Sequence, residues 1–208
     1  SRTPKGRKLR MQRTRFFTGA VVNNFKRLEN EVMPQYFKLA KKIEAGAAFI
    51  IEQIGYNARK QDELLRYLAL KNLRVPMLAN VYVLSRPAAR YFHSGRIPGV
   101  TVTGDLLARV EKEAASADKG KVFFLELAAK QCAVARGLGY RGVYLGGHLQ
   151  LEDYDRVLRL CQSFAEDDWK QFAPELNYDL EDEFYFFEPD SQSGLNTDEI
   201  SRTYLASK

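Results

Sequence analysis

The chain contains 208 residues, of which 45% are hydrophobic and 12% are aromatic, a composition that allows one sizeable core. It has no run of about 18 consecutive apolar residues, which excludes a transmembrane helix. Its basic first residues are followed by no apolar segment, which argues against a secretory signal peptide. We therefore expect a cytoplasmic protein with no membrane partner.

The net charge of +6 is concentrated at the amino terminus. Seven basic residues and no acidic ones occur in the first fifteen positions, and beyond them the charge is nearly balanced. We interpret residues 1–15 as a basic arm or a solvated connector. An arm that binds nucleic-acid phosphates is the alternative, but neither zinc-finger spacing nor an RNA-binding aromatic signature supports it. The basic residues are Arg2, Lys5, Arg7, Lys8, Arg10, Arg13 and Arg15.

Three strands and two helices are predicted in the first half of the chain. The strands are short apolar runs whose hydrophobic residues are consecutive rather than alternating, and the helices show apolar residues at helical spacing. The strands span residues 16–22, 48–53 and 76–83, and the helices span about residues 30–44 and 59–73. The apolar side of the second helix comprises Leu64, Leu65, Leu68 and Leu70.

The second half begins with a helix that Ser85 caps, that has Pro87 in its first turn, and that runs through about Phe92. A polar connector follows over residues 93–104. Two helices, a fourth strand and a further helix are then predicted within residues 105–115, 121–137, 139–147 and 151–164, respectively. From residue 165 onward the chain is acidic and aromatic without clear periodicity, which predicts a peripheral wrap.

The alternation of strands and helices predicts an α/β fold in which helices lie outside a parallel sheet. Four β/α units are visible in the sequence. That number fits either a small open α/β sheet or half of a (β/α)8 barrel, and hydrophobic periodicity alone does not distinguish the two.

Side chains that could bind a metal are few. Cys132 and Cys161 lie far apart in the sequence in apolar-periodic surroundings, and we expect two buried free thiols rather than a disulfide or a metal pair. The two histidines, His93 and His148, have no Cys or carboxylate partners at ligand spacing, so we expect no metal site. We interpret the carboxylates at residues 181–183 as a solvated acidic run.

The segment KKIEAGAAFIIEQ, residues 41–53, resembles the methylenetetrahydrofolate reductase family. In that family a Lys-rich helix end leads through an Ala-Gly-Ala turn into a strand that ends in Gln. Four further blocks resemble the family in the same order: FFTGAVVNNF, RVPMLANVYVLS, SGRIPGVTV and GYRGVYLGGH. The resemblance implies that residues 16–164 form the carboxyl-terminal half of a TIM-type (β/α)8 barrel, with residues 165–208 as an acidic, aromatic extension.

The resemblance also implies an activity in one-carbon and methionine metabolism. FAD would accept a hydride from NADH or NADPH and reduce 5,10-methylenetetrahydrofolate to 5-methyltetrahydrofolate. Ala20 and Val22, at the end of the first strand, match positions that line the flavin. Lys38, Lys41 and Lys42 match the helix face that meets the FAD phosphates and ribose, although an amide is common in place of the first lysine and Arg in place of the second. A solvated lysine face is the alternative for these three.

Four residues are candidates for substrate binding. Gln53 matches the glutamine whose amide recognises the pterin ring, a role that suits a group with both a donor and an acceptor; a buried, satisfied glutamine is the alternative. Tyr56 would stack on the substrate or cap the barrel mouth. Phe92 matches an aromatic that stacks on substrate or nicotinamide, or it belongs to the core. His148 would make a polar contact, or it is an ordinary loop histidine.

The sequence departs from the family at two places. Residues 145–148 read Leu-Gly-Gly-His where the family commonly shows an aromatic-Thr-Leu-Asn pattern, and Ala88 stands where a polar side chain often contacts folate. The glycines remove an aromatic wall and let the backbone approach a ligand closely. These departures indicate a divergent branch.

The matching blocks correspond only to the last four strands of the family barrel. The first half, which supplies the general acid, is not found, so the catalytic residues stay unassigned. Four strands leave two open sheet edges, and we therefore expect a missing amino-terminal barrel half, a partner chain or a homo-oligomer. The alternative functions are a folate- or corrinoid-linked methyl-transfer protein and a non-catalytic half-barrel subunit that completes a partner's active site.

Overall fold

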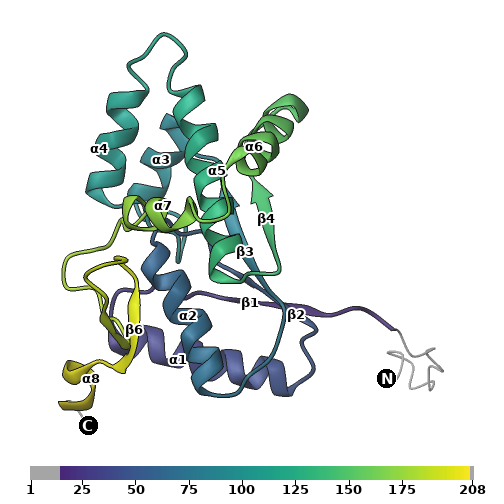
Figure 1. Ribbon diagram of the computed structural model, residues 1–208, viewed down its shortest axis with the longest axis vertical. Helices are drawn as coiled ribbons and strands as arrows, with labels where there is room; N and C mark the ends of the chain where they lie inside the picture. The colour runs from purple at the N-terminus through teal and green to yellow at the C-terminus, as the bar shows by residue number, and fades with distance from the viewer. Residues whose placement is uncertain (1–14, 207–208) are drawn as a thin grey trace, which may run out of the picture.

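The computed structural model describes residues 15–206, so residues 1–14 of the predicted basic arm lie outside the described part of the chain. None of the helices within residues 15–206 is long and apolar enough to cross a membrane. The main strands are β1 (Gly19–Val22), β2 (Phe49–Glu52), β3 (Met77–Tyr82) and β4 (Gly142–Gly146). The helices between and after them are α1 (Glu29–Glu44), α2 (Ala58–Leu70), α3 (Arg86–His93), α4 (Gly104–Glu113), α5 (Lys121–Leu138) and α6 (Leu151–Ser163). The last part of the chain adds α7 (Trp169–Glu175), β5 (Phe187–Pro189), β6 (Asn196–Ile200) and α8 (Arg202–Ala206) (Figure 1).

The four main strands form one parallel sheet in the order β1-β2-β3-β4. Figure 1 shows them fanning out from β1, which runs across the view, to β4, which runs upward, as expected for a twisted sheet. The predicted α/β class and the four β/α units are confirmed. A closed (β/α)8 barrel is not found in residues 15–206, where β1 and β4 are edge strands that pair on one side only, because four strands do not span the circumference of such a barrel.

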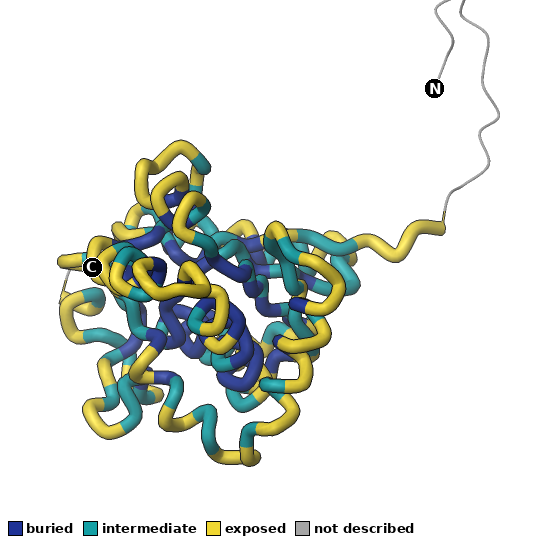
Figure 2. Tube along the Cα trace, turned by 90° about the horizontal axis from the view of Figure 1, so that it is seen from above, coloured by how far each residue is buried: buried dark blue, intermediate teal, exposed yellow. Residues whose placement is uncertain are grey.

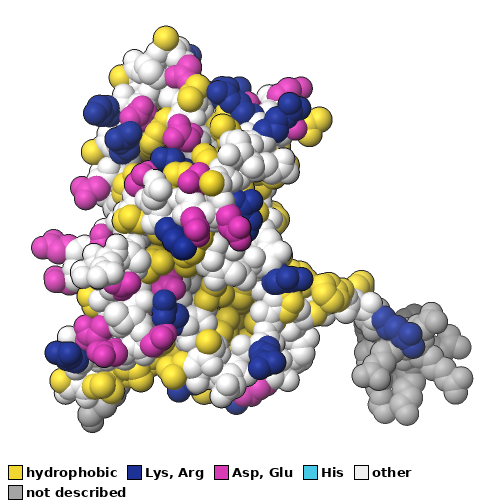
Figure 3. All heavy atoms as spheres, viewed as in Figure 1, with side chains coloured by type: hydrophobic (Ala, Val, Ile, Leu, Met, Phe, Trp, Pro, Cys, Tyr) yellow, Lys and Arg dark blue, Asp and Glu magenta, His cyan; other side chains and the backbone are white. Residues whose placement is uncertain are grey.

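The local signals for individual elements agree with the structure. Ser85 caps α3 by accepting a hydrogen bond from the backbone N–H of Ala88, with Pro87 in the first turn as predicted. The first strand begins at Gly19, three residues later than the apolar run indicates. The reason is that Phe16 and Phe17 are 81% and 79% exposed. Figure 3 shows hydrophobic side chains gathered on the part of the chain that projects from the main body.

Helices cover one face of the sheet. Ile50 and Glu52 of β2 and Val81 of β3 point to this face and are at most 1% exposed, beneath α1, α2 and α5. Figure 2 shows these buried segments gathered at the centre of the molecule. The consecutive apolar residues of the strands predict burial on both faces, but the described residues bury only this one.

The opposite face, which we call the open face, carries Val21, Ile51, Leu78, Asn80 and Tyr144. None of these side chains is buried. Val21 is 62% exposed and Tyr144 is 57% exposed. The open face is therefore the part of the sheet that is available for a ligand or for a further layer of protein.

Residues 165–206 are more regular than their aperiodic sequence indicates. Helix α7 packs on α5, and β5 pairs with β6 in an antiparallel hairpin. Phe186 and Phe187 are 4% and 3% exposed, and the ring of Phe186 contacts that of Tyr67 on α2 edge to face, with 5.4 Å between the centroids. This segment is therefore part of the core around α2.

The interpretation of residues 181–183 as a solvated run is wrong for Glu183. Its Oε2 accepts hydrogen bonds from Asn57 Nδ2 at 3.0 Å and from the Tyr185 hydroxyl at 2.9 Å. Local acidity alone suggested solvent exposure. One partner, Asn57, lies far away in the sequence at the cap of α2, and the other, Tyr185, lies two residues along the chain. The carboxylate therefore joins the extension to the amino-terminal end of α2.

The contact between α5 and α7 depends on the absence of a side chain at Gly137. A Cβ at this position would lie 2.2 Å from the indole ring of Trp169. We expect Gly137→Ala to lower the free energy of unfolding by about 1–3 kcal/mol, the usual cost of overpacking. Urea denaturation measures this, with Gly104→Ala as the control, because a Cβ there would meet nothing within 4 Å. Equal stability of the two variants would contradict the packing argument.

Candidate functional site

Three amide side chains and a tyrosine form one row across the open face, at the carboxyl ends of the strands. The register of β1 against β2 makes Asn23 the neighbour of Gln53, and that of β2 against β3 makes Gln53 the neighbour of Asn80. Asn80 in turn pairs with Tyr144 of β4. We call Asn23, Gln53 and Asn80 the amide row. Because ligands of parallel α/β sheets bind at the carboxyl ends of the strands, the amide row is the candidate site.

The connector between α3 and α4 closes one end of the amide row. Asn23 Nδ2 donates to the backbone carbonyl of Gly99 at 3.2 Å, and Asn23 Oδ1 accepts from the N–H of Phe25 at 3.1 Å. Gly99 has a φ of +81°, and a Cβ there would lie 2.2 Å from Asn23 Nδ2. A glycine is therefore required at this position both by its backbone conformation and by the close approach.

The other two amides keep hydrogen-bonding capacity. Gln53 Oε1 accepts from the N–H of Ile54 at 2.9 Å, and no described residue accepts from its Nε2. The side chains of Asn80 and Tyr144 likewise have no hydrogen-bond partner among the residues that the structure describes. The residues next to the amide row on the open face are apolar and include Ile51 and Leu78. The site thus combines uncommitted amide groups with an apolar floor, a combination that suits a flat heterocycle.

Tyr56 and Phe92 are buried next to the end of β3. Tyr56 is 3% exposed, and its hydroxyl donates to the backbone carbonyl of Tyr82 at 3.0 Å. Phe92 is 7% exposed and meets the Tyr82 ring edge to face, with 5.1 Å between the centroids. The stacking of these two residues on a substrate stays a prediction; in the described residues both side chains are buried and contact Tyr82 at the end of β3.

The buried carboxyl of Glu52 lies directly behind the amide row and was not identified from the sequence. It is 1% exposed and accepts hydrogen bonds from the Tyr140 hydroxyl at 2.7 Å, from Asn24 Nδ2 at 3.3 Å, and from Gln61 Nε2. Burial raises its pKa to about 7, although the hydrogen bonds act in the opposite direction. A charged residue inside the apolar run FIIEQ was the only signal of this feature.

The residues expected to bind FAD lie on β1 and α1, and two of the three lysines have partners in the described residues. Lys41 pairs with Glu44 at 2.8 Å, and Lys42 Nζ donates to the backbone carbonyl of Val21 at 2.6 Å. Lys38 is exposed on the same helix. Ala20 and Val22 point to the helix-covered face, since they alternate with Val21 and pack in the core around α1. Of the three lysines, only Lys38 has no partner for its ammonium group among the described residues.

His148 lies apart from the amide row. It is exposed and lines a cavity of about 650 Å³ together with Ser85, Lys119 and Lys121. This cavity lies between the segment after β3, the turn between α4 and α5, and the start of α6. The contact of His148 with the substrate stays a prediction.

No metal centre is found in the described residues: residues 15–206 contain no group of three or more His, Cys, Asp or Glu side chains placed to hold an ion. His93 Nδ1 instead lies 2.8 Å from the backbone carbonyl of Val102. Both cysteines are free thiols, as expected, but Cys161 is only half-buried. Cys132 lies on α5 and Cys161 on α6, two helices that pack against each other.

No protein-family model and no curated protein matches the chain. Among solved structures, an uncharacterised protein from Clostridium thermocellum that binds two copies of 5-methyl-5,6,7,8-tetrahydrofolic acid is similar, with a TM-score of 0.47 and 14% sequence identity. The match covers 69% of this chain and 51% of that protein. The chain therefore spans about half the length of the protein it matches.

Proposed function

We propose that the chain binds the pterin ring of a reduced folate on its open face, as the folate-binding part of a methylenetetrahydrofolate reductase-like oxidoreductase. The observation that carries the proposal is the amide row. A pterin presents alternating hydrogen-bond donors and acceptors along one edge, and carboxamides offer both kinds of group. Gln53 Nε2 and the Asn80 amide supply them side by side.

The shape and polarity around the amide row support a flat, partly apolar ligand. Ile51 and Leu78 provide an apolar surface beside the amides, and Tyr144 adds an exposed aromatic ring at the β4 end. Aromatic and apolar surfaces bind heterocycles by stacking and burial, while a few polar groups fix the orientation. The amides would thus orient the pterin, and the apolar row would remove its face from water.

The open edges of the sheet favour completion of the site by a further β/α half. Both β1 and β4 have one side without a strand partner within residues 15–206, and exposed strand edges are usually covered or paired. We propose that another β/α unit, from the same polypeptide or another one, packs on the open face and supplies the general acid. A second copy of this chain is one such partner.

FAD fits the described residues poorly, because Lys41 and Lys42 are already engaged and Ala20 and Val22 point away from the open face. We therefore assign no step of the reaction to these residues. Reduction of 5,10-methylenetetrahydrofolate with NADH or NADPH stays part of the proposal through the resemblance of the sequence. The same poor fit favours, as a second candidate, a folate-linked methyl-transfer protein that needs no flavin.

Calorimetric titration with 5-methyltetrahydrofolate tests the pterin site. We expect Gln53→Ala to weaken binding about tenfold, the effect of about 1.4 kcal/mol from one lost hydrogen-bonding group. Gln171→Ala is the matched control, since it removes an exposed amide on α7, away from the sheet. No measurable binding by the unmodified chain, or equal binding by the two variants, would contradict the assignment.

A titration with FAD, followed by flavin fluorescence, separates the two candidate functions. Quenching on addition of the protein, followed by bleaching with NADH or NADPH, supports the reductase. Folate binding without any flavin binding supports the methyl-transfer protein instead.

A further inference from the structure

The buried carboxyl of Glu52 connects the inner sides of the strand ends that carry the amide row. Neighbouring side chains of an extended segment point to opposite faces, so Asn24 and Glu52 point into the core. Their chain neighbours Asn23 and Gln53 point to the open face. Burial follows this alternation, since Asn24 and Glu52 are 0% and 1% exposed and the other two are only partly buried. The hydrogen bond from Asn24 Nδ2 to Glu52 Oε2, at 3.3 Å, therefore joins the two strand ends directly behind the two amides.

The position of the Asn24 side chain depends on two hydrogen-bond acceptors. Its Nδ2 donates to Glu52 and, at 3.2 Å, to the backbone carbonyl of Lys60 on α2. Its Oδ1 is buried and has no hydrogen-bond partner among the residues that the structure describes. A change at the Glu52 carboxyl therefore acts directly on Asn24. Through the backbone it also acts on Asn23, at the β1 end of the amide row.

Tyr140 gives the carboxyl two hydrogen-bond arrangements. The Tyr140 hydroxyl lies 2.7 Å from Glu52 Oε2 and 3.3 Å from the backbone carbonyl of Gln61. When Glu52 is ionised, Tyr140 donates to the carboxylate, as do Asn24 Nδ2 and Gln61 Nε2. When Oε2 is protonated, the acid donates to the Tyr140 oxygen, and Tyr140 donates to the Gln61 carbonyl instead. A neutral acid is a weaker acceptor than a carboxylate, so protonation weakens the hydrogen bond from Asn24.

Glu52 changes charge near neutral pH, whereas the tyrosines around it do not. Burial raises the pKa of Glu52 to about 7, although its hydrogen bonds act in the opposite direction. Burial also raises the pKa values of Tyr36 on α1 and of Tyr140 above the ordinary 10, so both hydroxyls stay neutral. The two arrangements of the cluster therefore interconvert in the range where most proteins work.

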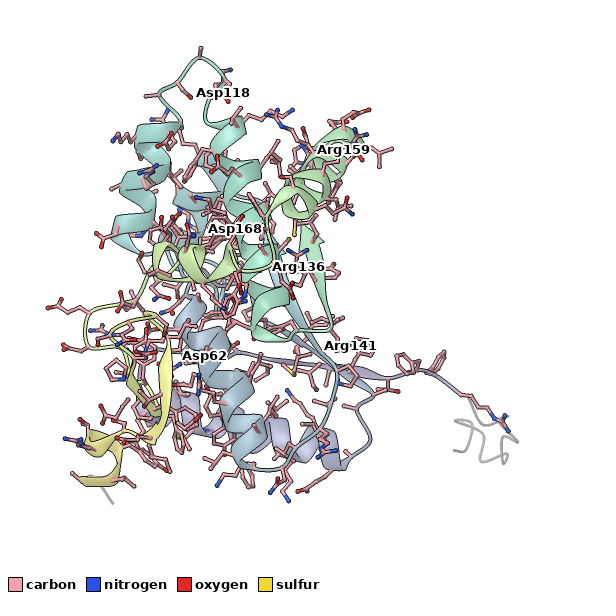
Figure 4. All side chains as sticks on the ribbon, in the orientation of Figure 1. Asp62, Asp118, Arg136, Arg141, Arg159 and Asp168 are labelled. Carbon is pink, nitrogen blue, oxygen red and sulfur yellow. The ribbon has the colours of Figure 1, made fainter. Side chains whose placement is uncertain are left out.

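The other charged groups near Glu52 lie on α2 and belong to ion pairs. Asp62, labelled in Figure 4, has its Oδ2 2.8 Å from Arg66 Nε. Lys60 Nζ lies 3.8 Å from Glu63 Oε1. Within the described residues, none of these four side chains makes a hydrogen bond to the Glu52 carboxyl. Protonation of Glu52 therefore requires no change in these pairs.

From this arrangement we infer that Glu52 is a protonation-sensitive positioning residue of the amide row. Its ionised form holds Asn23 and Gln53 in the arrangement that binds the ligand, and its neutral form loosens them. The inference rests on the proposed function, because it concerns the same site. Affinity for a reduced folate should rise as the pH rises through 7. By linkage, the bound ligand favours the ionised form, so binding should release protons.

Calorimetric titration with 5-methyltetrahydrofolate between about pH 5.5 and about pH 8.5 tests the inference, because this range brackets the titration of Glu52. We expect the affinity of the unmodified chain to rise about fivefold, the lower end of the usual coupling between sites. The affinity of Glu52→Gln, which does not titrate, should stay nearly constant. Glu44→Gln is the matched control, since it removes an exposed carboxylate of α1 and should behave as the unmodified chain. Titration of the ligand itself is common to the three proteins. Equal pH dependence in the unmodified chain and Glu52→Gln would overturn the inference.

Tyr140→Phe distinguishes positioning by charge from a merely structural role. The substitution removes one donor to the carboxylate and leaves the ring in place. The ionised form of Glu52 loses a hydrogen bond, so the midpoint of the pH dependence should move to higher pH. Lower affinity at every pH without a movement of the midpoint would overturn the inference. Circular dichroism verifies that Tyr140→Phe and Glu52→Gln fold.

Nuclear magnetic resonance separates a failure of this inference from a failure of the proposed function. In the unmodified chain without ligand, the side-chain amide signals of Asn23 and Gln53 should shift with pH, with a midpoint near 7. In Glu52→Gln they should not. If the chain binds no folate at any pH, the proposed function is wrong, and such a shift still supports the link between Glu52 and the amide row. Signals that do not move with pH would overturn that link, whatever the chain binds.

Discussion

Replacing Glu63 with alanine is expected to lower the free energy of unfolding by about 3–5 kcal/mol, because it leaves the ammonium group of Lys60 buried without its carboxylate. Both side chains are completely buried, with Lys60 Nζ 3.8 Å from Glu63 Oε1. Few single substitutions outside a protein's apolar core have so large an effect. Urea denaturation at neutral pH provides the measurement.

The size of the effect follows from the number of groups that Glu63 satisfies. Its Oε1 accepts from the Tyr36 hydroxyl at 2.7 Å, and its Oε2 accepts from the backbone N–H of Phe186 at 2.5 Å. Lys60 also donates to the carbonyl of Phe184 and lies 4.4 Å from the ring centroid of Tyr185. Removal of the carboxylate therefore orphans a hydroxyl and a backbone donor in addition to the ammonium group.

Two controls separate this account from a general loss of helix stability. Glu44→Ala removes an exposed carboxylate from the Lys41–Glu44 pair on α1 and should change stability by no more than about 0.5 kcal/mol. The double variant Lys60→Met, Glu63→Leu removes both buried charges and should be less destabilised than Glu63→Ala alone. If the double variant is the less stable of the two, the buried charge is not the cause.

This network also shows where sequence patterns stop being informative. The apolar spacing of α2 indicated Leu64 and Leu68 as buried residues, and they are buried. The same pattern placed Leu70 on the apolar side, yet it is 45% exposed, whereas Lys60 and Glu63 are fully buried. A helical wheel assigns charged residues to solvent. Here their partners come from Tyr36 on α1 and from residues 184–186, which are more than a hundred positions away. No local pattern reports such contacts.

The sequence predicted the candidate site only in part, as it did the buried residues of α2. Gln53 was identified at the end of a strand, and the structure places it on the open face. Its neighbours Asn23, Asn80 and Tyr144 were not, because a row across a sheet depends on the register of the strands, which short apolar runs leave undetermined. Phe92 lies on a helix as expected, but its contact with the ring of Tyr82 depends on how α3 packs against β3, which the local sequence does not report.

The stability of the chain should depend on pH through Glu52. Its pKa is raised from an ordinary 4.5 to about 7 because the folded protein buries it, so the folded state favours the neutral acid. Its contribution to stability is therefore fully present below pH 4.5 and is lost as the pH rises through 7. Each pKa unit corresponds to 1.36 kcal/mol, so Glu52 should lower the free energy of unfolding by about 3 kcal/mol across this range.

Glu52→Gln isolates this term, because the amide keeps the shape of the side chain but does not titrate. Other groups titrate as well, among them Glu183, whose pKa burial also raises, but they are present in both proteins and cancel in the difference. Relative to the unmodified chain, the variant should gain about 3 kcal/mol in stability between pH 4.5 and pH 8. Urea midpoints at a series of pH values measure the gain. If the two stability curves run parallel over this range, Glu52 is already ionised in the folded protein, and its hydrogen-bond donors outweigh the cost of burial.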